Sequence, residues 1–284
     1  MKMEKYQVKH KFFPSYLAWT ALFFFLQLPS GKTQQIFSFE LAYNFLQTGK
    51  TVQSDPLGFF YLFKEDGELL KLDTTGKVQF RYSTTRDGDL SGFDPYNGLQ
   101  TLCWFKDFQK IIVLNRTLQP ESEILLSDLD IFYAGTVKTA LDGNIWVYDE
   151  NNFQLKKINP GGKLLLTGNR LDLVLGQNWH PVHMVEYDNH VYLTDPDQGI
   201  LVLDVFGNFI KTLPITGVKY FFIRNHKIFY LQNFAMQQFD LVSLLDYSSK
   251  APELLLKAPR HFWEGKYWYQ IFPDQIKIFR YKAG

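Results

Sequence analysis

Residues 141–169, LDGNIWVYDENNFQLKKINPGGKLLLTGN, decide the fold that we expect for this chain. The stretch opens on an Asp-Gly turn at Asp142, and the aromatic and β-branched run 145–148 follows. A second alternating run at 153–158, an Asn-Pro-Gly-Gly turn and a third short run at 163–167 complete it. Short alternating runs separated by turn residues are typical of antiparallel strands. The stretch therefore predicts three strands of a β-meander, a unit that cannot bury both of its faces alone.

Similar units recur along the chain at a spacing of about 40 residues, as in propeller repeats. Each contains strand-like runs and turn residues, and each is preceded by one further apolar run. The other units span 58–83, 109–127, 189–215, 225–248 and 265–281. The repeats predict an all-β protein, a six-bladed β-propeller of four-stranded antiparallel blades.

The two ends of the repeat region are expected to meet. The last unit lacks its outermost strand, because the sequence stops soon after the run Ile276–Tyr281. The run Ile36–Tyr43 has no repeat of its own. An open blade would leave unpaired backbone groups on its edge. We therefore expect the N-terminal strand to close the ring of a single propeller domain over residues 34–284.

Two of the units resemble NHL-type propeller repeats. The resemblance rests on Asp142–Asp149, followed by Leu155–Ile158 and Gly162-Lys163. Residues 188–211 are similar, and residues 58–82 are a looser match. The resemblance implies the propeller fold. It implies no single activity, because such propellers serve as ligand-binding, signalling and occasionally catalytic modules.

Residues 1–31 have the pattern of a secretory signal peptide, with cleavage expected between residues 30 and 34. Four lysines between positions 2 and 11 precede the uncharged run Tyr16–Leu28. That run is shorter than the roughly 20 residues that a membrane span needs. The alternative is an uncleaved N-terminal anchor. We therefore expect an exported protein that is periplasmic, associated with the outer envelope or secreted.

The charge of the mature chain argues against nucleic acid as a partner. Residues 1–31 contain four of the 30 basic residues and one of the 29 acidic residues, so their removal leaves a formal charge of −2. A nucleic-acid binder is expected to be basic. The single cysteine, Cys103, excludes an internal disulfide and is expected to be a small buried apolar residue.

The long connection 84–97 supplies one group of candidate binding residues, Asp87, Asp89, Asp94 and Tyr96. Long loops on a rigid scaffold often carry function. The pattern D-G-D-L-S-G begins like a calcium loop, but Gly98 occupies the position of the bidentate Glu. An ordinary Asp- and Gly-rich loop is the favoured interpretation, and a calcium site is the alternative.

The connection 168–181 and the residues after it supply the second group, Trp179, His180 and His183. The resemblance to NHL-like lyases would imply histidines on several inner strands around the channel. Here three of the five histidines outside residues 1–31 fall within one repeat, which argues against zinc catalysis. Histidines held by ordinary hydrogen bonds are the favoured interpretation.

The residues assigned to the innermost strands favour a binding protein over an enzyme. These strands are assigned to 52–54, 102–104, 137–139, 183–185, 219–221 and 255–257, which contain no acidic residue and one histidine. We therefore expect a non-catalytic module without a cofactor. It would bind a protein or small ligand through its loop-bearing face, as an accessory of cell-envelope machinery that reaches the membrane through a partner. The alternative is a propeller hydrolase or lyase with a calcium or zinc ion at the central channel.

Overall fold

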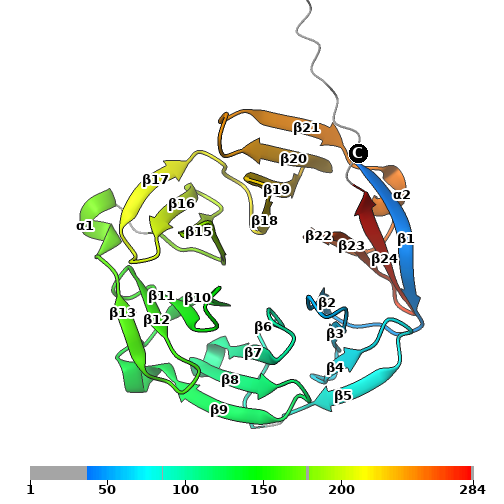
Figure 1. Cartoon of the computed structure of the whole chain (residues 1–284), viewed down its shortest axis with the longest axis horizontal. Coiled ribbons are helices and arrows are strands. Elements are labelled where there is room, and N and C mark those ends of the chain that lie inside the picture. The colour runs from blue at the N-terminus through cyan, green and yellow to red at the C-terminus, as the bar shows by residue number, and fades with distance from the viewer. Residues whose placement is uncertain (1–36, 85, 177–178, 283–284) are drawn as a thin grey trace, which may run out of the picture. The chain divides into compact units, whose positions relative to one another are not determined.

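Six four-stranded antiparallel sheets follow one another around a central channel (Figure 1). The computed structural model describes residues 37–84, 86–176 and 179–282. The expected signal peptide, residues 1–31, and its cleavage zone lie outside the described residues. The described part confirms the prediction of a six-bladed β-propeller with four-stranded blades.

Blade 1 is the first blade whose four strands are consecutive in the sequence, and the other blades follow in sequence order. Blade 1 contains β2 (Thr51–Ser54), β3 (Phe60–Phe63), β4 (Leu69–Leu72) and β5 (Val78–Tyr82), and blade 2 contains β6 (Gly92–Asp94), β7 (Gln100–Phe105), β8 (Lys110–Asn115) and β9 (Pro120–Leu125). Blade 3 contains β10 (Ala134–Thr139), β11 (Ile145–Asp149), β12 (Gln154–Ile158) and β13 (Leu164–Thr167), and blade 4 contains β14 (His183–Tyr187), β15 (His190–Asp195), β16 (Gly199–Asp204) and β17 (Phe209–Leu213). Blade 5 contains β18 (Phe221–Arg224), β19 (Lys227–Gln232), β20 (Ala235–Asp240) and β21 (Asp246–Lys250), and blade 6 contains β22 (Arg260–Glu264), β23 (Tyr267–Ile271), β24 (Ile276–Lys282) and β1 (Ser38–Phe45).

The N-terminal strand closes the ring, as the sequence predicted. β1 lies antiparallel to β24, with Phe39 opposite Tyr281 and Phe45 opposite Ile276. A register shift between Leu41 and Tyr43 interrupts the ladder. The pairing supplies the outermost strand of blade 6 and covers the edge of β24.

The hydrophobic core of the described residues is divided among the interfaces between neighbouring blades. Each of six buried clusters joins two adjacent blades. Strand β3 shows why, because successive side chains of a strand point to opposite faces. Phe60 and Leu62 pack toward blade 6, whereas Tyr61 and Phe63 pack toward blade 2. The middle strands are therefore buried on both faces, which explains their continuous apolar runs.

Glycine permits a turn and a close approach in blade 3. Gly143 has a φ of +81° in the turn between β10 and β11, where its N–H donates to the Ala140 carbonyl at 3.0 Å. A Cβ atom on Gly168 would lie 2.9 Å from the Cα atom of Gly207 in blade 4. A side chain at position 168 would therefore push the two blades apart.

Two innermost strands differ from the sequence assignment. Residues 102–104 belong to β7, the second strand of blade 2, and the innermost strand is β6. Residues 253–256 form helix α2, residue 257 follows it, and the innermost strand of blade 6 is β22. The three residues of β6 lie in a polar loop sequence that carries no apolar alternation. The prediction of a channel without acidic residues was therefore wrong, because Asp94 and Glu264 belong to the true inner strands.

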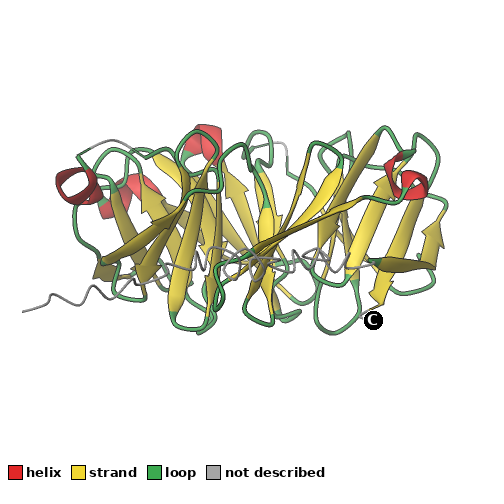
Figure 2. Cartoon of the chain, turned by 90° about the horizontal axis from the view of Figure 1, so that it is seen from above, coloured by secondary structure: helices red, strands yellow, loops and turns green. Residues whose placement is uncertain are grey.

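The helices lie on one face of the propeller, as Figure 2 shows. Helices α1 (Leu171–Leu175) and α2 (Glu253–Leu256) and the 3₁₀ turn Leu126–Leu129 connect an outermost strand to the innermost strand of the next blade. The 3₁₀ turn Lys106–Phe108 connects β7 to β8. We call this face the loop-bearing face. Within the ranges that the structure describes, no helix is both long enough and apolar enough to cross a membrane.

Candidate functional site

A polar cavity of about 520 Å³ occupies the central channel. It extends from Lys106 and Val182, next to the loop-bearing face, to Glu264 at the far end of β22. Inner strands contribute polar side chains to its wall, among them Gln53, Asp94, Lys138 and His183. A concave site with converging polar groups is the usual geometry for a small ligand.

An ion pair between neighbouring blades lies in the wall of this cavity. Lys138 Nζ in blade 3 lies 3.0 Å from Asp94 Oδ1 in blade 2. The second oxygen of Asp94 accepts a hydrogen bond from the Thr139 N–H at 3.0 Å, so that β10 holds the carboxylate from two sides. Burial alone would lower the pKa of Lys138, but the carboxylates of Asp94 and Glu264 outweigh it and raise the pKa above its usual value. Lys138 is therefore a fixed cation.

His183 is a neutral imidazole at the start of β14. Its Nε2 lies 2.8 Å from the Phe221 carbonyl oxygen, which can only accept, so Nε2 carries the hydrogen and Nδ1 is the acceptor. Burial lowers the pKa of His183 to about 3, and the nearby charge of Lys138 adds to the effect. The ring packs on Tyr220, with the two ring centroids 4.4 Å apart. His183 thus offers a hydrogen-bond acceptor without a charge.

Glu264 completes the cavity from blade 6. The Tyr220 hydroxyl from the start of blade 5 donates a hydrogen bond to its carboxylate. Burial raises the pKa of Glu264, although Lys138 and the bond from Tyr220 oppose that shift. No lysine, arginine or histidine among the described residues lies within 4.0 Å of this carboxylate. Within the described part of the chain, Glu264 is therefore an acid in the cavity without an ion-pair partner.

The seven candidate residues predicted from the sequence do not form one site. Two of them line this cavity. These two are Asp94 and His183. Tyr96 lies in the β6–β7 hairpin, at the end of the channel opposite the loop-bearing face. Trp179 is buried in the core between blades 3 and 4. His180 is exposed, and its Nδ1 contacts the Glu150 carboxylate.

The two remaining candidates lie in the connection between β5 and β6. Asp87 forms an ion pair with Lys110 of β8 and also accepts a hydrogen bond from Thr84. Burial would raise the pKa of Asp87, but the bonds from Lys110 and Thr84 outweigh it and hold the pKa below its usual value. Asp89 is exposed beside a smaller cavity of about 180 Å³. Asp87 thus ties its loop to blade 2.

The described side chains do not form a metal site. Across the described residues, no group of three or more His, Cys, Asp or Glu side chains has the geometry to hold a metal ion. In the cavity, Asp94 is held by Lys138 and Thr139, and His183 turns Nε2 toward a backbone carbonyl.

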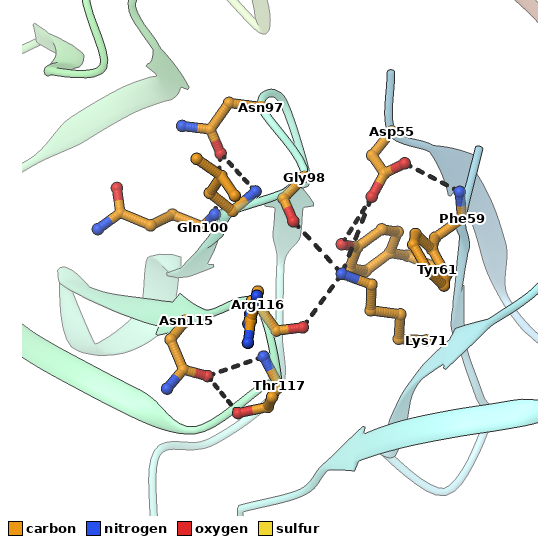
Figure 3. A network of polar contacts seen from close by, with 11 residues as sticks. Asp55, Phe59, Tyr61, Lys71, Asn97, Gly98, Gln100, Asn115, Arg116 and Thr117 are labelled. Carbon is orange, nitrogen blue, oxygen red and sulfur yellow. Dashed lines mark hydrogen bonds and ion pairs between the residues drawn. The ribbon is translucent and has the colours of Figure 1, made fainter. Parts of the chain in front are cut away.

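A second buried polar network lies between blades 1 and 2 (Figure 3). Lys71 Nζ lies 3.9 Å from Asp55 Oδ2 and donates to the carbonyl oxygens of Gly98 and Arg116 at 3.4 and 3.1 Å. The Tyr61 hydroxyl donates to Asp55 at 3.1 Å. The side chain of Asp55 is 0% exposed and that of Lys71 is 3% exposed. This network is closed to solvent and links turns of blade 2 to blade 1.

Sequence reasoning missed three residues of the cavity: Lys138, Tyr220 and Glu264. The available signal was the alternation of side chains on an inner strand. Glu264 directly precedes the Gly265-Lys266 turn that ends β22. Its position could have been inferred only with the inner strand of blade 6 correctly placed.

Comparisons with known proteins support the fold. No protein-family model and no curated protein sequence matches the chain. A catalytically inactive virginiamycin B lyase from Staphylococcus aureus, solved with quinupristin, is similar to it with a TM-score of 0.63 and 12% identity, covering 86% of this chain and 99% of the lyase. A streptogramin B lyase is similar with a TM-score of 0.57 and 13% identity, covering 87% of this chain and 88% of the other. The CNH domain of AfRom2 is similar with a TM-score of 0.52 and 8% identity, covering 82% and 80%. At such identities the similarity shows a shared propeller fold and no shared activity.

Proposed function

We propose that this protein is an NHL-like propeller that binds a small polar ligand in its central cavity. One observation carries the proposal. Asp94, Lys138, His183, Tyr220 and Glu264 come from five different blades and converge on one space. Charged and neutral polar groups on a rigid wall can orient a ligand without first having to be ordered.

This polar cluster is separate from the apolar clusters that pack the blades against one another. The apolar clusters between the blades already bury the middle strands. Glu264 and His183 both have pKa values displaced by burial in the cavity. Displaced pKa values in a concave site are typical of functional residues. A binding role accounts for the retention of these groups beside a cavity.

A substitution at Gly92 tests the proposal. Gly92 lines the cavity two residues before Asp94, and a Cβ atom built on it meets no atom within 4 Å. Gly92→Phe should therefore fill the cavity while preserving β6. We expect ligand-observed NMR with a library of small polar compounds to find binders of the wild type that Gly92→Phe does not bind.

Gly161→Phe is the matched control, because Gly161 lies in the exposed turn between β12 and β13. It should keep all binders. The proposal fails when no compound in the library binds the wild type, or when all binders are retained by Gly92→Phe at an unchanged melting temperature.

One observation favours a second candidate, an enzyme such as a hydrolase or lyase. Asp94, His183 and Glu264 place ionisable side chains from blades 2, 4 and 6 around the same cavity. A carboxylic acid with a raised pKa is suited to proton transfer. Mass spectrometry of each cavity binder after incubation with the protein separates the candidates. Conversion that is lost in Glu264→Gln favours the enzyme, and unchanged binders favour the binding module. Metal analysis of protein purified without added metal tests the calcium and zinc alternatives.

Export remains a proposal that rests on residues 1–31. N-terminal sequencing of the protein from the culture medium or envelope fraction should find a chain that begins between residues 31 and 35. A full-length product in the cytoplasm would contradict export.

A further inference from the structure

The two ends of the cavity carry opposite charges. Glu264 is the last residue of β22, directly before the hairpin at the end of the channel away from the loop-bearing face. Lys106 follows β7 on the loop-bearing face. Both side chains line the same cavity. The charge therefore changes from positive at the loop-bearing end to negative at the deep end.

Neither of these charges is neutralised by an ion pair within the described protein. Among the described residues, no carboxylate lies within 4.0 Å of Lys106 Nζ, which lies over the face of the Tyr133 ring, 5.3 Å from its centroid. Glu264 accepts a hydrogen bond from Tyr220 but forms no ion pair with any described residue. In contrast, two other charged residues of the cavity wall, Lys138 and Asp94, form an ion pair at 3.0 Å.

We propose that the central cavity takes a small zwitterion, a compound with an ammonium group at one end and a carboxylate at the other. This inference rests on the proposed function of the cavity. The ammonium group would lie at the deep end, beside the Glu264 carboxylate. The ligand carboxylate would lie near Lys106. Opposite charges at both ends favour this orientation and disfavour the reverse one.

The surroundings of the Glu264 carboxylate suit the same ligand. Tyr220 packs against His183 and donates its hydroxyl hydrogen to Glu264. The carboxylate keeps further lone pairs that can accept from an ammonium group. A neutral or anionic group at this place would gain less, because it offers fewer donors to the available acceptors.

The experiment uses ω-amino acids of increasing length, from glycine and β-alanine to γ-aminobutyrate and ε-aminocaproate. Hexylamine and hexanoate are the probes with a single charge. Isothermal titration calorimetry should show that one length binds best and that it binds at least about tenfold more tightly than either single-charge probe. One good charged contact is worth about that factor.

Two variants test which charged group of the ligand each end of the cavity binds. Glu264→Gln should weaken binding of the best amino acid about ten- to a hundredfold, and Lys106→Met about tenfold. Lys106→Met should leave hexylamine binding unchanged, and Glu264→Gln should leave hexanoate binding unchanged. Glu121→Gln and Lys163→Met, at exposed positions away from the channel, are the matched controls. If Glu264→Gln does not fold, Tyr220→Phe tests the same end by releasing the carboxylate.

The outcomes separate this inference from the proposed function. The screen could find cavity binders while the amino acids bind no better than hexylamine or hexanoate. In that case the proposal of a zwitterionic ligand is wrong, but the proposal that the cavity binds a small polar ligand is still supported. Equal affinity in Lys106→Met for the best amino acid also overturns the zwitterion. If no compound depends on the cavity in the Gly92→Phe comparison, both proposals fail.

Discussion

Two lysines beside carboxylates show how differently the same residue pair is used in this propeller. Lys71, between blades 1 and 2, lies near Asp55 and donates to two backbone carbonyl oxygens. Lys138, in the channel, pairs with Asp94 at 3.0 Å and lies near the second carboxylate of Glu264. Burial dominates at Lys71 and lowers its pKa, whereas the carboxylates dominate at Lys138 and raise its pKa.

The difference separates a structural ion pair from one that lines a site. The ammonium group of Lys71 lies 4.6 Å from the Phe59 ring centroid and 5.0 Å from that of Tyr61, so its surroundings are filled by protein. The side chain of Lys138 is 24% exposed and borders a cavity. A substitution at Lys71 should therefore affect stability, whereas one at Lys138 should affect mainly the ligand.

Lys71→Met is expected to have the largest effect on stability. It leaves the Asp55 carboxylate buried without its cation and two carbonyl oxygens without a donor. Loss of one partner of a buried ion pair costs about 3–5 kcal/mol. Urea unfolding followed by tryptophan fluorescence measures the loss. Lys64→Met, at a more exposed ion pair, is the control and should leave the midpoint nearly unchanged. An unchanged midpoint in Lys71→Met would mean that the network contributes nothing to the blade interface.

The pH dependence of stability should report on His183. Its pKa falls from an ordinary value of 6.5 to about 3 in the folded protein. Below pH 6.5 His183 becomes protonated in the unfolded chain, whereas in the folded protein it stays neutral down to about pH 3. The stabilisation is therefore complete above pH 6.5 and is lost as the pH falls toward 3.

At pH 5 the loss from His183 should be about 2 kcal/mol, the product of the pH difference and about 1.4 kcal/mol per unit. Urea unfolding of the wild type and His183→Gln at pH 7 and pH 5 isolates this contribution. Parallel changes in the two proteins would show that His183 is protonated as easily in the folded state as in the unfolded one.

Lys138→Met sharpens the comparison with Lys71. Water in the cavity can hydrate Asp94 after the cation is lost, so we expect a loss of stability of only about 1.5 kcal/mol. In the Gly92→Phe variant the phenyl ring fills the cavity and displaces this water. In that background Lys138→Met should reduce the free energy of unfolding by more. A loss as large as that of Lys71→Met would show that the two pairs are equivalent and that the channel pair is structural.

Tyr61→Phe should have the smallest effect. It removes one hydroxyl donor from Asp55, which keeps the Phe59 N–H at 2.9 Å and the nearby Lys71. The expected loss is about 1 kcal/mol. A double-mutant cycle with Lys71→Met measures the coupling within the network. Strict additivity would contradict the view that Asp55, Tyr61 and Lys71 act as one unit.

The sequence by itself determined the blades and the closure of the ring. Asp-Gly and Asn-Pro-Gly-Gly turns bound the strands of blade 3, and the continuous apolar run of β11 predicts a strand buried on both faces. The pairing of β1 with β24 followed from the need to cover an edge. These features depend on local turn chemistry, side-chain alternation and backbone hydrogen bonding, all of which are visible in short segments.

Only the tertiary structure decided the candidate site. Strand β6 has three residues in a Gly- and Asp-rich segment, and the Leu-rich residues 253–256 form a helical turn that overlaps the expected strand 255–257. The convergence of Asp94, Lys138, His183 and Glu264 depends on how four separate blades are placed around one axis. The physical reason is that each side chain lies on a strand of a different blade, and a local sequence pattern does not determine the distances between blades.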